Sequence, residues 1–281
     1  MIRKKLLTLI LLSISAMASA QIQGGSEKEA SGDLEFTAIA EMGYLGVFDH
    51  KVQFSNDGTY FDYKRDGGQD VLFPISRLSL ELTFNKRNTF VLLYQPLRLE
   101  SQVLLQDDLV VDGLTFPASS GVKLLYNFPF YRISYLRELK TNNETFKFAI
   151  GGTLQLRNAT ISFESTDGTR FRTNRDLGPV PALKIKSRKD FGERYFLELE
   201  ADGMYAPVSY LNGSDNEVVG AILDASLRSG IEFNQQVSSF LNLRYLGGGA
   251  VGTSDNQGPG DGYVKNWLHF YTVTVGFKYS L

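Results

Sequence analysis

Cysteine is absent from the 281-residue chain, which also contains only two histidines and one tryptophan. The absence of cysteine excludes a disulfide framework, a thiolate metal site, a thiol nucleophile and a lipid-modified amino-terminal cysteine. Two histidines without cysteine are too few ligands for a zinc site of the usual kind, so we expect no metal. Beyond residue 20 no apolar run is long enough for a membrane-spanning helix, which excludes an α-helical membrane bundle.

What the chain does contain is enough apolar material for a folded core. Hydrophobic residues make up 43% of it and charged residues 21%, which is too apolar for intrinsic disorder. We therefore expect a folded protein.

The first twenty residues have the pattern of a secretory signal peptide. Arg3, Lys4 and Lys5 precede an apolar stretch from 6 to 17, and Ala18-Ser19-Ala20 is a small-residue cleavage pattern. The apolar stretch is too short for an uncleaved membrane anchor, so we expect cleavage before Gln21 and a periplasmic amino-terminal segment over 21–33. Loss of three cations changes the formal net charge from −2 to −5. A mildly acidic exported chain without a basic face is not expected to bind nucleic acid.

Strict alternation of apolar and polar residues dominates the rest of the chain. Every second residue from Tyr271 to Leu281 is apolar, which predicts a strand with one apolar face. The segment 146–157 alternates over enough residues to cross a bilayer at the usual tilt. Ten segments of this kind can be recognised: 34–48, 71–85, 89–105, 121–139, 145–164, 179–190, 194–206, 219–233, 238–247 and 264–281.

The connections between these segments alternate strictly between short and long. The short ones are 85–88, 140–144, 191–193 and 234–237, and both ends of the chain lie on their side. An even strand number with short turns at one end and long loops at the other is typical of outer-membrane barrels. The sequence predicts an all-β fold, a transmembrane antiparallel up-and-down β-barrel of about ten strands over 34–281, with short periplasmic turns and long extracellular loops.

With its export signal and its final alternating strand, the chain resembles the bacterial outer-membrane β-barrel class. The resemblance implies a location in the bacterial outer membrane, contact with outer-membrane lipids and lipopolysaccharide, and insertion by the outer-membrane assembly machinery. Members usually end in Phe or Trp, so the terminal Leu281 weakens the implied insertion signal. The strand number is also similar to that of the omptin proteases and of some ten-stranded adhesins, but that similarity is only a count.

Charged residues share one face of the predicted hairpin around 191–193. If Phe191, Gly192 and Glu193 form the turn, Lys186 lies opposite Glu198 and Lys184 opposite Glu200. In lipid this face must be the interior, because a lysine or arginine on the outside at the midplane costs about 2–4 kcal/mol. The same interior network is predicted to include Arg77, Glu81, Arg157, Asp224, Arg228, Glu232 and Arg244. Ten strands leave little space around such side chains, so a wide pore is excluded.

The network has two interpretations. In the first, opposite charges only neutralise one another in a partly hydrated lumen. In the second, the carboxylates of Glu198, Glu200 and Asp202 form a ladder that serves as general acid and base or binds a divalent cation near the upper mouth. Gly247, Gly249 and Gly252 fit the dinucleotide-binding pattern, but no helix follows them, so the pattern does not indicate a nucleotide site. No cofactor is therefore expected.

Catalytic candidates are few. By parity His269 faces outward with the aromatic residues of the last strand, and His50, next to Asp49, is expected to be a solvated loop residue. The chain has no Asp-x-His pair, so the omptin catalytic residues have no counterpart here, and it has no Gly-x-Ser-x-Gly elbow. His269, Glu198 and Asp202 remain as weak catalytic candidates.

One predicted loop is basic. Arg170, Arg172 and Arg175 are candidates to bind lipopolysaccharide phosphates, or they are solvated and paired with the nearby Glu164, Asp167 and Asp176. Taken together, the sequence favours a non-enzymatic outer-membrane barrel with a narrow charged lumen and a structural or small-solute passage role. The alternatives are a barrel-embedded hydrolase acting on lipid or peptide, and a surface adhesin.

Overall fold

A computed structural model describes residues 34–207, 218–253 and 259–281. The predicted signal peptide and the segment 21–33 lie outside the described residues. No helix among the described residues is long and apolar enough to cross a membrane. The strands are β1 Leu34–Phe54, β2 Phe61–Asp62, β3 Leu72–Phe84, β4 Asn88–Gln95, β5 Arg98–Leu104, β6 Leu109–Val111, β7 Leu114–Phe116, β8 Gly121–Asn127, β9 Phe130–Leu139, β10 Phe146–Ser165, β11 Phe171–Phe191, β12 Tyr195–Pro207, β13 Val219–Glu232, β14 Val237–Thr253 and β15 Tyr263–Ser280.

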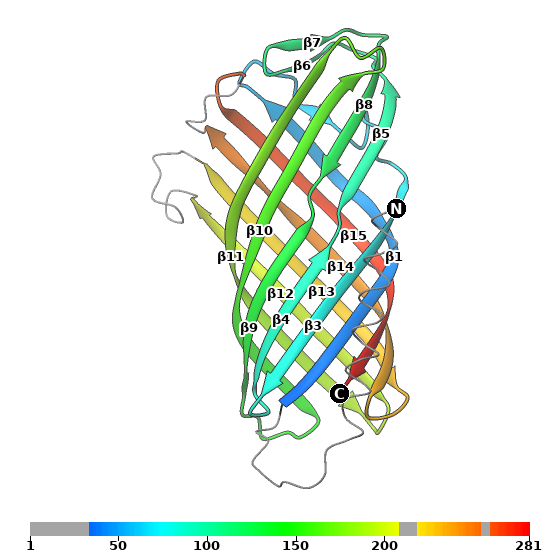
Figure 1. Ribbon diagram of the computed structural model, residues 1–281, viewed down its shortest axis with the longest axis vertical. Helices are drawn as coiled ribbons and strands as arrows, with labels where there is room; N and C mark the ends of the chain where they lie inside the picture. The colour runs from blue at the N-terminus through cyan, green and yellow to red at the C-terminus, as the bar shows by residue number, and fades with distance from the viewer. Residues whose placement is uncertain (1–33, 208–217, 254–258) are drawn as a thin grey trace, which may run out of the picture. The chain divides into compact units, whose positions relative to one another are not determined.

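Ten of these strands form a closed antiparallel ring (Figure 1). Its order is β1, β3, β4, β9, β10, β11, β12, β13, β14 and β15, and β15 pairs back with β1. β5 continues β4 after an interruption at Pro96, and β8 leads into β9 after one at Pro129. The predicted up-and-down barrel of about ten strands is therefore confirmed.

The outside of the ring is apolar between two rows of aromatic side chains. On β3, Leu78, Leu80 and Leu82 point outward and are exposed, whereas Arg77, Ser79 and Glu81 point inward and are buried. The aromatic row nearer the short turns contains Phe36, Phe90, Tyr135, Tyr195, Phe277 and Tyr279, and the other contains Tyr44, Tyr94, Tyr131, Tyr245 and Tyr271. An apolar band between aromatic girdles is the outer surface of a membrane barrel, so the protein is a transmembrane β-barrel.

Several strands are longer than predicted and reverse their apolar face beyond this band. On β10, Ile150 and Leu154 face outward, but Ile161 and Phe163 face inward and are buried, with polar Thr160 and Ser162 on the outside. β1 changes in the same way after Tyr44: Leu45 and Val47 face inward and are buried. Its register with β15 then shifts at a bulge between Val47 and Asp49. An apolar interior with a polar exterior is the pattern of a soluble β-sandwich. The extracellular part of the protein therefore folds as one, in water.

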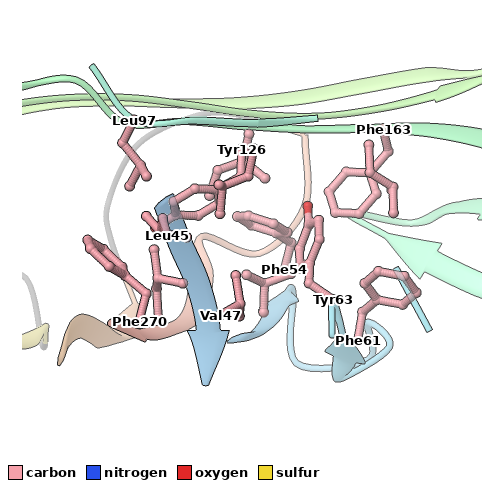
Figure 2. Packing of buried hydrophobic residues seen from close by; sticks show 14 of the residues in the cluster. Leu45, Val47, Phe54, Phe61, Tyr63, Leu97, Tyr126, Phe163 and Phe270 are labelled. Atoms are coloured by element: carbon pink, nitrogen blue, oxygen red, sulfur yellow. The ribbon is translucent and has the colours of Figure 1, made fainter. Parts of the chain in front are cut away.

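This extracellular part consists of two sheets that close over the bore. One sheet contains β5, β8, β10 and β11, and the other contains β12 to β15 with β1 and β3. Their facing side chains form a hydrophobic core, which we call the apolar cap (Figure 2). Its members include Leu45, Val47, Phe54, Phe61, Tyr63, Leu97, Leu99, Leu124, Tyr126, Phe163, Leu246, Leu268 and Phe270. The segment 57–70, which lies between two predicted strands, thus contributes the buried Phe61 and Tyr63 to the cap.

Where β3 and β5 separate, the chain covers the resulting edge. β3 pairs with β4 only from Leu78 onward, and β5 pairs only with β8. The segment around Gly67 and Gly68 lies across this edge, and Ser101 on β5 donates a hydrogen bond to the carbonyl of Gly67 at 2.5 Å. Gly68 has a φ of 69°, and a Cβ there would meet Val103 at 3.0 Å, so glycine is required for this close approach.

Candidate functional site

Twelve ionised side chains cross the bore below the apolar cap, and we call them the charged layer. Six are cationic and six are carboxylates, so their formal charges cancel. They come from seven strands, and all are buried except Lys186, which is partly buried. The members are Glu41, Arg77, Glu81, Arg132, Lys184, Lys186, Glu198, Glu200, Asp202, Asp224, Arg228 and Arg244.

Arg228 on β13 joins three carboxylates from two other strands. Its guanidinium nitrogens lie 2.6 Å from Glu198, 3.4 Å from Glu200 and 3.1 Å from Glu41. Glu41, on β1, also accepts hydrogen bonds from Asn242 at 2.7 Å and Thr274 at 2.9 Å. This one arginine therefore ties together both sides of the bore.

The lysines of β11 extend the same network. Lys184 Nζ lies 2.7 Å from Glu200 and 2.8 Å from Asp202. Lys186 Nζ lies 2.9 Å from Glu81, on the far strand β3, and 3.6 Å from Glu198. Because Lys186 and Glu81 belong to strands that are not neighbours, their contact spans the bore.

Asp224 is the centre of the other half of the layer. It binds Arg132 at 2.5 Å and is also paired with Arg244, which donates a hydrogen bond to Gln95. Arg132 lies 3.6 Å from Asp202 as well, and the hydroxyl of Thr153 donates to Asp202 at 2.5 Å. The described side chains leave no enclosed space beside this group, next to Arg132 and Asp202, that is large enough for a water molecule.

The predicted register of the β11–β12 hairpin is wrong by two residues. Phe191 pairs with Tyr195, so the turn is Gly192 to Arg194, and Gly192 has the positive φ of 63° that such a turn uses. The residues directly opposite are therefore Lys184 with Asp202, Lys186 with Glu200 and Arg188 with Glu198. A shift of two leaves every charge on the predicted face. Lys184–Glu200 and Lys186–Glu198 still meet, as diagonal pairs.

Two other predicted lumen charges, Arg157 and Glu232, lie outside the layer. Arg157 pairs with Asp176 on the extracellular side. Arg188 pairs with Asp190 at 2.8 Å and with Glu232 near the short turns, and its guanidinium lies 4.1 Å from the ring centre of Phe196. These pairs are partly exposed at the two ends of the bore.

The carboxylate ladder of Glu198, Glu200 and Asp202 is fully engaged by cations. Each of the three contacts at least one lysine or arginine within 3.6 Å. In the described ranges no group of three or more His, Cys, Asp or Glu residues has the geometry of a metal site. A buried charge in such a network is costly to leave without its partner, so each of these carboxylates depends on its cations.

His269 lies on the outward face near the extracellular aromatic row. Its Nδ1 is 2.7 Å from the hydroxyl of Tyr245, and the two rings are tilted at 31° with centres 6.1 Å apart. Glu198 and Asp202 point into the bore from the other side of the barrel wall. The structure therefore does not bring these three catalytic candidates together.

The expectation that His50 is a solvated loop residue is wrong. The residue is 0% exposed, because β1 continues to Phe54 and the segment 61–69 folds over its inner face. The ring stacks on Tyr63 at 4.4 Å, meets the edge of Tyr126 at 4.4 Å, and its Nδ1 is 2.7 Å from Gln69 Oε1. Burial in the cap, beyond the membrane band, lowers the pKa of His50 to about 4.

Replacing His50 with Phe together with Gln69→Leu is expected to leave stability at pH 7 within about 1 kcal/mol of wild type. His50 Nε2 and Gln69 Nε2 are buried without hydrogen-bond partners, so apolar substitutes of similar shape remove no satisfied group except their mutual bond.

The same double variant should also lose a pH dependence. Because the pKa of His50 is lower in the folded protein than in the unfolded chain, the unfolded chain binds the extra proton as the pH falls below about 6.5. Wild type should therefore lose about 2 kcal/mol between pH 7 and pH 5, and the double variant much less. Guanidinium unfolding in lipid vesicles at both pH values measures this; parallel losses would show that His50 does not titrate in this range.

The three arginines of the predicted basic loop do not share a surface. β11 begins at Phe171, so Arg172 points inward and donates to the carbonyl of Asp112 at 3.1 Å, whereas Arg175 points outward and is exposed. Asp167 is held in its turn by Ser165 at 2.6 Å and Thr169, and these hydrogen bonds lower its pKa to about 2. Arg172 thus fastens the cap to β11.

Neither the protein-family models nor the curated proteins give a match. Among solved structures, Neisserial surface protein A is 12% identical (89% of this chain, 99% of that one, TM-score 0.29), and the transport unit of the autotransporter AIDA-I from Escherichia coli is 9% identical (96% and 97%, TM-score 0.38). Outer membrane protein AlkL is 8% identical (92% and 97%, TM-score 0.33). Because these TM-scores are low, the assignment of this chain as an outer-membrane β-barrel rests on its own strand pairing.

Proposed function

We propose that this protein is an integral component of the bacterial outer membrane whose bore is closed along its axis, in contact with lipid and lipopolysaccharide and inserted by the outer-membrane assembly machinery. The observation that carries the closed bore is the charged layer, in which ion pairs such as Lys186–Glu81 and Arg228–Glu41 join opposite walls. In this role the barrel lets no hydrophilic solute diffuse through its bore.

Two barriers of opposite polarity lie on the axis. The cavity beside Glu41 and Arg77 has a volume of about 10 Å³, room for at most about one water molecule, whereas typical ligand pockets have about 300–1,000 Å³. An ion that reached this level from the extracellular side would first have to cross the apolar cap, which costs it its hydration. An apolar molecule that crossed the cap would meet buried ion pairs. The sequence of layers therefore opposes both classes of solute.

The hydrolase and adhesin alternatives have less support. A barrel-embedded hydrolase needs a base beside a nucleophile or carboxylate in the barrel mouth. His50 is buried against two tyrosines and His269 faces outward, so neither has that geometry. For an adhesin, none of the contacts in the described ranges points to a partner.

Planar-bilayer recording tests the closed bore. The wild-type protein is expected to give no steady ion current. A variant with Arg132, Asp202, Asp224 and Arg244 all replaced by alanine keeps the balance of charge but removes four large side chains from the charged layer. Because the apolar cap still closes the bore above it, this variant should conduct only when Phe54 and Phe270 of the cap are also replaced by alanine. Heat-modifiable gel mobility establishes that each protein is folded. A steady wild-type current would contradict the proposal.

A further inference from the structure

Among the residues that the structure describes, none covers the edge between β11 and β12 in the barrel wall. Their pairing ends at Leu183 and Gly203, yet β11 continues to Phe171 along β10, and β12 continues to Pro207 along β13 (Figure 1). Among the described residues, 171–182 of β11 and 204–207 of β12 have no partner strand on this side. The last pair, Leu183 with Gly203, lies next to the Lys184–Asp202 pair. The two strands therefore separate on the extracellular side of the charged layer.

Three prolines keep the two strands apart. The amide of Asp190 points to β10 and that of Glu232 to β12, and the registers on both sides run without a shift. In an antiparallel ladder the backbone groups of successive residues point to opposite neighbours, so odd-numbered residues of β11 and β12 point at each other. Pro179, Pro181 and Pro207 are therefore placed where each would have to donate a hydrogen bond across the gap. Proline has no such donor, and the ladder cannot extend.

The same prolines also suit this edge to a lipid environment. Each unpaired backbone N–H facing hydrocarbon costs several kcal/mol, and proline removes that group. The rim is strongly apolar: Leu177, Leu183 and Tyr205, with 75–77% exposure, are the most exposed large apolar side chains among the described residues. The edge between β3 and β5 also contains a proline, Pro74, but there the chain lays its own segment across the gap.

Behind the gap lies a shallow recess. The described side chains leave no enclosed space in it large enough for a water molecule, so it is a surface hollow and not a cavity. Val180, Ala182 and Ile222 line its wall, and although these side chains point into the barrel they are partly exposed. Its floor includes Arg132, whose Nη2 is buried without a hydrogen-bond partner. The floor belongs to a charged layer of zero formal charge, so a neutral occupant is favoured over an ion.

We propose that this gap is a lateral port through which the end of an acyl chain of an outer-leaflet lipid enters the barrel wall. The apolar rim and wall match a hydrocarbon chain, and a chain requires no hydrogen bonds from an edge that lacks donors. The recess is shallow, so only the end of a chain enters the gap and the head group stays at the membrane surface. The port is independent of the axial barrier, because it ends above the charged layer.

Photo-cross-linking tests the port. The protein is reconstituted into vesicles of phosphatidylcholine that carries a diazirine at the end of one acyl chain, and cross-linked residues are identified by mass spectrometry. Wild type is expected to be labelled on the outward band and also on the inward-facing Val180 and Ile222. Ser226 also faces inward, but it lies at the level of the charged layer, between Asp224 and Arg228 on β13, and should remain unlabelled.

Two variants separate entry through the gap from other routes. Pro179→Val, Pro181→Val and Pro207→Val together restore three donors, so inward labelling should fall at least tenfold while outward labelling stays constant. Ala182→Phe fills the recess and should likewise lower inward labelling at least tenfold. Leu183→Phe, on the outward face, should leave inward labelling unchanged. Wild-type labelling confined to the outward band, or inward labelling unchanged in both the proline and Ala182 variants, would overturn the port. Neither result bears on bilayer conductance, which tests the axial closure separately.

Discussion

Replacing Arg228 with methionine is expected to destabilise the protein by about 3–5 kcal/mol, because it leaves Glu41, Glu198 and Glu200 without their shared cation. The methionine fills much of the same volume, so the loss reflects charge and not a cavity. Guanidinium unfolding of the protein in lipid vesicles, followed by its single tryptophan, measures the change.

Two further variants make this test specific. Arg194→Met, at an exposed turn position, should stay within about 0.5 kcal/mol of wild type. Adding Glu41→Gln to Arg228→Met removes one of the stranded charges and should recover at least about 1 kcal/mol. If Arg228→Met unfolds like wild type, the charged layer is not what holds the walls together, and the closed bore loses its main support.

The barrel was predictable because a membrane simplifies its sequence. Lipid selects apolar residues at every second position of a strand, and Leu78, Leu80 and Leu82 therefore identify the outer face without knowledge of any partner. The short connections then fix which strands are neighbours. The hairpin register was less accessible, since it depends on whether Phe191 belongs to the turn or to the strand.

The apolar cap was missed, although the sequence carries a signal for it. On β10 the apolar residues are even-numbered up to Leu156 and odd-numbered from Ala159, and β1 changes in the same way after Tyr44. Such a reversal within one strand indicates where lipid outside gives way to water. The reversal places His50 inside the cap, whereas a strand that ended at Phe48 would leave this residue in solvent.

The sequence did not predict which members of the charged layer pair with one another, because several of the paired residues lie on strands that are not adjacent in the ring. Alternation puts Glu41, Lys186 and Arg228 on the inner face, but which groups meet across the bore depends on strand tilt and stagger. The uncovered edge is similar: Pro179, Pro181 and Pro207 are visible in the sequence, yet their meaning requires knowing that all three backbones point at one gap.

Leu80→Arg is expected to cost about 2–4 kcal/mol and to block assembly of most of the protein, because the side chain faces hydrocarbon between the aromatic rows. The matched control is Thr83→Arg on the same strand. Thr83 faces inward near the short turns, where its hydroxyl is 3.0 Å from that of Thr89, and an arginine there can reach water. Heat-modifiable gel mobility after folding into vesicles reports the assembled fraction of each. The comparison depends only on which face each residue occupies, since both substitutions introduce the same side chain into the same strand. Equal assembly of the two variants would mean that the apolar face of β3 does not contact lipid.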